Sequence, residues 1–162
     1  MKKLLLLLML CPLMMISSCK DNAENTSDAN NVADTATVSK EMLLDQEIKA
    51  TNDQLPFQVD EATTLLSVVK DSECVVYEYS VNEGDMDFKQ FINNIEDFRN
   101  NIKNQIIAMS TPDSEVYAFM SLLRDTGRDL RYQYTGNQSG KVTTIEFTND
   151  ELQEMIKDFD ED

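Results

Sequence analysis

Residues 74–81 read CVVYEYSV, and residues 130–135 read LRYQYT. Successive side chains of a strand point to opposite faces, so each stretch predicts a strand with one buried side. Glu78 and Ser80 lie on one side of the first stretch, and we therefore expect the other side, with its tyrosines, to face the core. The tyrosines of the two stretches are Tyr77, Tyr79, Tyr132 and Tyr134.

Each of these strands has a partner across a polar turn. Residues 64–69 are β-branched and apolar, and a polar turn joins them to residues 74–81, which predicts a hairpin. A turn bounded by glycines joins residues 130–135 to residues 142–147, which predicts a second hairpin.

Four helices are expected around the hairpins. The first covers residues 39–53, with Ser39 as its N-cap, and helical spacing of apolar residues predicts one long helix over residues 87–109. Thr111 and Pro112 supply a cap and a first position for the third helix. Residues 148–151 form a capping box that opens the fourth.

The predicted order is α-β-β-α-α-β-β-α. The fold class is α+β, a four-stranded antiparallel sheet with helices packed on one face. Residues 39–162 are long enough to form a single domain with its own core and without disulfides.

The N-terminal residues 1–18 have the features of a secretory signal peptide. Two lysines precede an apolar run from Leu4 to Ile16, and small residues follow it. A bilayer-spanning helix needs about 20 apolar residues, so this run is too short to span a membrane. We therefore expect the chain to be exported.

The segment Ile16-Ser17-Ser18-Cys19 resembles the lipobox of bacterial lipoproteins, with Ile where Leu is usual. This resemblance implies attachment of diacylglycerol to Cys19 and cleavage before it. The alternative is ordinary signal cleavage, which would leave a free thiol at Cys19. Acyl chains would anchor the protein in the cell envelope, and we expect the outer membrane of a Gram-negative bacterium, with the periplasmic and surface faces as open alternatives.

Residues 19–38 are polar and carry no large hydrophobic side chain after Cys19, so we expect them to form a disordered tether. Cys11 is lost with the signal peptide, and Cys74 then has no cysteine with which to form an intramolecular disulfide. In its strand, Cys74 is expected to be a small buried hydrophobic residue rather than a reactive thiol.

The composition excludes several functions. The 162 residues include 14 Lys and Arg against 30 Asp and Glu, a net charge of −16, which becomes −18 when Lys2 and Lys3 are removed. A nucleic-acid partner would require a basic surface. The absence of His excludes Ser-His and Cys-His nucleophiles. We expect no cofactor and no metal ion.

Two sets of side chains form a possible binding surface. The tyrosine pairs could be an aromatic platform for a sugar or peptide, but a cross-strand aromatic ladder in the core is the favoured interpretation. Arg128 and Arg131 could hold a carboxylate, although pairing with the nearby Asp125 and Asp129 is favoured.

The Leu55-Pro56 pair, the two Tyr-x-Tyr strands and the Gly127-x-x-Leu130 spacing resemble a group of small, exported, uncharacterised bacterial proteins. The likeness runs from about Ile48 to Phe147. Members often carry a Cys between the two middle helices, where this chain has Ser110-Thr111. The resemblance implies the same fold order and no activity.

Three functions remain after these exclusions. The first is a non-enzymatic envelope lipoprotein whose acidic domain binds a protein or glycan partner. The second is a structural or assembly factor of an outer-membrane complex. The third is a hydrolase that uses two carboxylates, which would require a cleft containing both of them.

Overall fold

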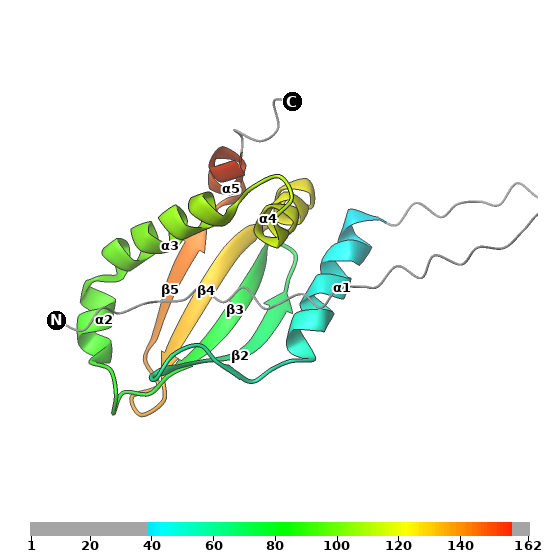
Figure 1. The fold of residues 1–162 in the computed structure, drawn as a ribbon. Helices are drawn as coiled ribbons and strands as arrows, with labels where there is room; N and C mark the ends of the chain where they lie inside the picture. Colours follow the sequence, from blue (N-terminus) through cyan, green and yellow to red (C-terminus); the bar gives the residue numbers. More distant parts are fainter. Residues whose placement is uncertain (1–38, 157–162) are drawn as a thin grey trace, which may run out of the picture.

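The computed structural model describes residues 39–156. The predicted signal peptide, the lipidation site Cys19 and the tether up to residue 38 lie outside the described residues, as do residues 157–162. Figure 1 shows that the described chain has an α+β fold, with helices packed against one sheet.

The sheet has five strands in the order β1-β2-β3-β4-β5. Both predicted hairpins are confirmed, because β2 pairs with β3 and β4 with β5 in antiparallel fashion. The strands are β1 (Phe57–Gln58), β2 (Thr63–Lys70), β3 (Cys74–Val81), β4 (Asp129–Gly136) and β5 (Val142–Phe147).

The prediction of a four-stranded antiparallel sheet is wrong in two respects. A two-residue strand, β1, is added beside β2, and β3 and β4 run parallel rather than antiparallel. The alternation of side chains defines the two faces of each hairpin but contains no information about how two hairpins align. Residues 82–128 provide the long crossover connection that a parallel pair requires.

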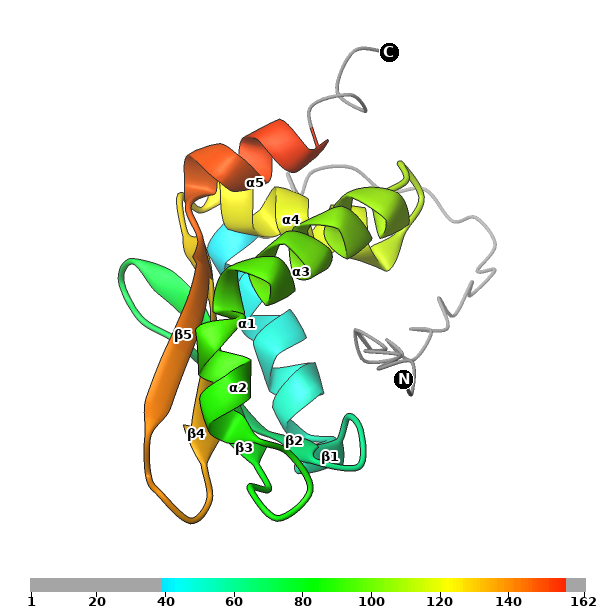
Figure 2. The same ribbon diagram turned by 90° about the vertical axis from the view of Figure 1, so that its left-hand side faces the viewer.

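The helices lie on one face of the sheet, as the edge-on view in Figure 2 shows. They are α1 (Lys40–Asn52), α2 (Phe88–Asn93), α3 (Ile95–Met109), α4 (Glu115–Asp125) and α5 (Asn149–Ile156). Leu44 of α1, Leu123 of α4 and Phe147 of β5 are fully buried between the layers. On the opposite face Leu66, on β2, and Val142 remain about half exposed.

The predicted helix caps are partly correct. The Ser39 hydroxyl accepts a hydrogen bond from Met42 N, and Thr148 and Glu151 exchange the two bonds of a capping box. The N-cap of α4 is Ser114 rather than Thr111, and its hydroxyl accepts from Tyr117 N at 3.1 Å. Both positions have hydroxyl side chains, so residue type alone does not distinguish them.

The predicted long helix is interrupted at Asn94, which separates α2 from α3 (Figure 1). The backbone of Asn94 has φ −107° and ψ 20°, outside the helical range. Its side-chain amide donates to Gln90 O at 3.0 Å. The side chain of asparagine competes in this way for backbone groups that a helix would use. The helical spacing of apolar residues therefore continues from α2 into α3 although the helix itself is interrupted.

Parallel pairing brings the ends of β3 and β4 together, because Val81 lies opposite Gly136. Just beyond them, the Glu83 carboxylate accepts hydrogen bonds from the backbone N–H groups of Gln138 and Ser139, at 2.8 and 2.6 Å. A Cβ atom on Gly136 would lie 2.8 Å from Glu83 Cδ, so a side chain there would displace the carboxylate. This contact fixes the segment that leads into α2.

We expect the Glu83 contact to weaken in acid. Hydrogen bonds from Ser139, its backbone N–H first, lower the pKa of Glu83 from its ordinary value of 4.5. A carboxyl group whose pKa is lower in the folded state than in the unfolded state stabilises the fold at any pH above the unfolded-state pKa. This contribution is lost as the pH falls through the folded-state pKa. Glu83→Gln should therefore lower stability at pH 7 and lose less stability than the wild type between about pH 5 and pH 3.

Urea unfolding at a series of pH values measures this difference. The control is Glu61→Gln, because Glu61 is an exposed carboxylate in the turn before β2 that forms no hydrogen bond or ion pair within the described residues. Equal pH profiles for Glu83→Gln and the wild type would show that the contact contributes nothing to stability.

Candidate binding site

The four tyrosines form a ladder under the helices. Tyr132 and Tyr134 are 3% and 5% exposed, and Tyr77 and Tyr79 are half-buried against the same core. The Tyr79 and Tyr134 rings stack with their centroids 4.9 Å apart. Burial raises the pKa of both Tyr132 and Tyr134. The rings therefore belong to the packed layer between sheet and helices rather than to an exposed platform.

The two arginines pair with residues far away in the sequence. Arg128 donates from its Nη2 to both oxygens of Glu41, on α1, at 3.0 and 3.1 Å. Arg131 Nε donates to Glu146 Oε2 at 2.7 Å, because the register places Glu146 directly opposite it on β5. The predicted pairing of both arginines with neighbouring aspartates is wrong, since strand register and the position of α1 decide their partners.

Cys74 lies at the start of β3 and is 1% exposed. Its thiol donates to Asp71 Oδ2 at 3.4 Å. Burial, followed by the hydrogen bond to Asp71, raises the pKa of Cys74 to about 11. The thiol therefore stays protonated at neutral pH, and a protonated buried thiol is a poor nucleophile.

The α2–α3 groove is an open hollow of about 310 Å³ along the bent helix pair. Its floor is formed by Met86, Phe91 and Phe98, and most of its exposed lining is apolar. The Phe91 and Phe98 rings lie edge to face, with centroids 4.9 Å apart. Both rings also contact Tyr134 edge to face, at 5.1 and 5.9 Å, so the aromatic ladder supports the floor.

The rim of the groove carries carboxylates and amides. The carboxylates are Asp87 and Asp97, and the amides are Gln90, Asn94 and Asn101. Asp87 caps α2 by accepting from Gln90 N at 3.0 Å. The Asp97 carboxylate forms no ion pair or hydrogen bond within the described residues. None of the lining residues is Lys or Arg.

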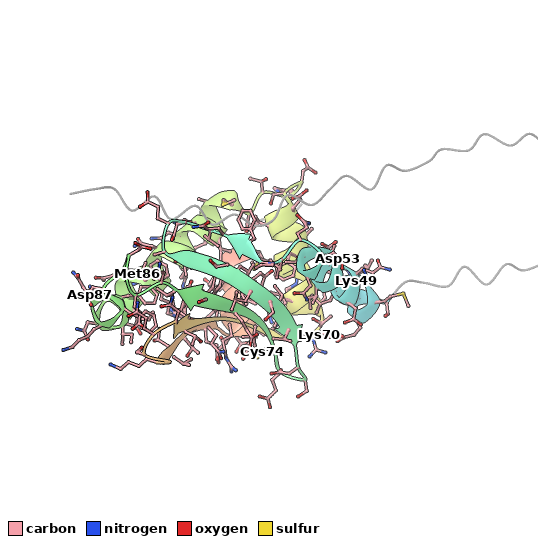
Figure 3. The ribbon with its side chains drawn as sticks, turned by 90° about the horizontal axis from the view of Figure 1, so that it is seen from below. Lys49, Asp53, Lys70, Cys74, Met86 and Asp87 are labelled. Atoms are coloured by element: carbon pink, nitrogen blue, oxygen red, sulfur yellow. The ribbon has the colours of Figure 1, made fainter. Side chains whose placement is uncertain are left out.

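A second, more polar cavity of about 450 Å³ adjoins the groove and shares Met86 and Asp87 with it. Glu83, which is held by the β4–β5 turn, also lines this cavity. Figure 3 shows Met86 and Asp87 at the opposite end of the fold from Lys49 and Asp53 of α1. The groove therefore lies away from the end of the fold marked by these two α1 residues.

A carboxyl group with a raised pKa lies outside the groove. Desolvation, and then the charge of Glu115 on α4, raises the pKa of Glu47 on α1. Neither residue lines the groove or the adjoining cavity. Among residues 39–156, no three acidic or thiol side chains are grouped to hold a metal ion. None of the helices described by the structure is both long and apolar enough to cross a bilayer.

The groove is the feature that sequence analysis missed. The sequence predicts one continuous helix over residues 87–109, which contains Phe91 and Phe98 but gives no sign of a groove. The available signal was the pair Asn93-Asn94 in the middle of an apolar helix, where two poor helix formers interrupt a strong periodicity. This signal locates a break but not a groove.

No family model matches the chain, and no curated protein sequence matches it. A crystal structure of a protein from Pseudomonas aeruginosa proposed to be secreted is similar in fold, with a TM-score of 0.56 and 14% identity. A pilotin of the Vibrio vulnificus type 2 secretion system has a TM-score of 0.45 and 12% identity. Each alignment covers 70% of this chain and 92% of the other. At these identities the first similarity shows a shared fold alone, and the second is too low to support a statement about this chain.

Proposed function

We propose that this protein is an exported, lipid-anchored binding module without catalytic activity. In this proposal Cys19 carries the acyl chains, residues 20–38 form the tether, and the folded region captures a protein partner in the α2–α3 groove. The observation that carries the proposal is the half-buried pair Phe91 and Phe98, which forms the apolar floor of an open hollow. The protein that carries this hollow is acidic.

An apolar floor ringed by a few polar groups is the usual composition of a binding site. Met86, Phe91 and Phe98 supply apolar area, and burial of a large side chain against them contributes about 1.5–3 kcal/mol. The floor is held in place by Tyr134, so it exists before a partner binds. A preformed site avoids part of the entropic cost of binding.

A binding function agrees with the state of the chemically capable side chains. The Cys74 thiol is buried and protonated. Glu83 beside the groove accepts backbone hydrogen bonds, and Asp87 on its rim caps a helix, so both of these carboxylates have structural roles. Asp97 is the carboxylate of the groove lining without such a role. Assembly of an outer-membrane complex would be one form of the proposed function, because assembly also depends on capture of a segment of another protein.

The anchor is tested by intact mass spectrometry of the protein expressed in a Gram-negative host. We expect a mature chain that begins at Cys19 and carries diacylglycerol in thioether linkage, and Cys19→Ala should leave the protein unprocessed at that bond. An unprocessed Met1, or a free thiol at Cys19 after cleavage, would contradict the proposal.

The groove is tested by filling it. A random peptide library displayed on phage is selected against the full chain in mild detergent. Selected peptides should carry a large apolar residue and should lose at least about tenfold in affinity for Asn101→Trp, whose indole would occupy the hollow. Asn101 is exposed on the rim, so the substitution leaves the core intact.

The matched control is Asn100→Trp, the adjacent exposed residue of α3, which does not line the groove. It should bind the selected peptides as the wild type does. Equal binding to all three proteins, or equal loss in both variants, would show that the groove is not the binding site.

A further inference from the structure

We propose that the occupant of the α2–α3 groove is a cationic segment of a partner protein, in which a large apolar side chain is followed closely by Lys or Arg. This inference rests on the proposed function and specifies its partner. The apolar side chain lies on Phe91 and Phe98, and the cation pairs with Asp97 on the rim.

Charge complementarity is the first reason for a cation. The groove is lined by two carboxylates and by no Lys or Arg. Asp97 has no pairing partner within residues 39–156, whereas Glu41, Glu146 and Glu151 each pair with an arginine. A carboxylate left without a cation beside an apolar surface favours a partner that supplies one.

The adjoining cavity extends the negative region. Glu83, Asp85 and Asp87 line it together with a single cation, Lys89. The mature chain of the proposed function, without Lys2 and Lys3, has a net charge of −18, which attracts a cationic segment over a distance of about one Debye length. An acidic segment would meet repulsion both at long range and at the rim.

The rim amides favour a segment with free backbone groups. Gln90 and Asn101 are exposed side-chain amides, and each offers both a donor and an acceptor. An extended segment has unpaired N–H and C=O groups that such amides can satisfy. A volume of about 310 Å³ is at the lower limit of ligand pockets, so one or two side chains fill it.

The test uses blocked hexapeptides with the cores Phe-Lys, Phe-Glu and Ala-Lys in a Gly-Ser background. Binding to the full chain in mild detergent is followed by amide chemical shifts in NMR spectra. The Phe-Lys peptide should shift residues of the groove and bind up to about fivefold more tightly than Phe-Glu, the range of one exposed ion pair. The Ala-Lys peptide should bind more weakly than Phe-Lys.

Charge reversal at two adjacent residues distinguishes an ion pair formed at Asp97 from attraction by the net charge of the protein. Asp97→Lys should reverse the preference and favour Phe-Glu over Phe-Lys. Glu96→Lys changes the net charge equally in the same turn of α3 but does not line the groove, so it should keep the preference for Phe-Lys.

The possible failures are distinguishable. Equal binding of Phe-Lys and Phe-Glu in the groove would overturn the cationic partner and leave the proposed function standing. Equal effects of Asp97→Lys and Glu96→Lys would overturn the pairing at Asp97. Chemical-shift changes in the groove residues on addition of chitotetraose would identify the occupant as a glycan instead of a cationic segment. The same changes on raising the protein concentration without peptide would identify it as a second copy of the chain. No groove shift with any peptide would overturn the proposed function as well.

Discussion

The parallel pairing of β3 with β4 determines the path of the chain between the two hairpins. Two parallel neighbours leave the sheet at the same end, so the chain between them must return along the sheet before β4 can begin. Residues 82–128 make this return as α2, α3 and α4, all on the helical face (Figure 2). The same pairing places the exit of β3 beside the β4–β5 turn, where Glu83 joins the two.

The aromatic side chains connect this sheet to the groove. Tyr79 stacks on Tyr134 within the sheet, and Tyr134 contacts Phe91 and Phe98 of the helices above it. Tyr134 is almost fully buried, whereas Phe91 and Phe98 are only partly covered. The bend at Asn94 leaves their outer surface as the floor of a hollow instead of closing it with a continuous helix.

Local features could be predicted from the sequence, and long-range geometry could not. The bounds of β3 and β5 and the Thr148–Glu151 capping box depend on neighbouring residues and were predicted correctly. The parallel alignment, the partner of Arg128 and the two-residue β1 depend on contacts between distant segments, for which periodicity carries no information. For the site, the sequence predicted lipidation at Cys19, which lies outside the described residues, and did not predict the groove.

The edges of the sheet explain why a partner would bind at the helices. An edge strand normally offers unpaired backbone groups to a further strand. At the β2 edge, the Asn52 side chain donates to Val68 O and accepts from Val68 N, at 2.7 and 2.8 Å, and so takes the place of a neighbouring strand. At the β5 edge, Arg99 Nε donates to Glu146 O at 3.1 Å. Side chains of the helical layer therefore occupy backbone groups that strand addition would need, whereas the α2–α3 groove offers apolar area and a carboxylate without a partner.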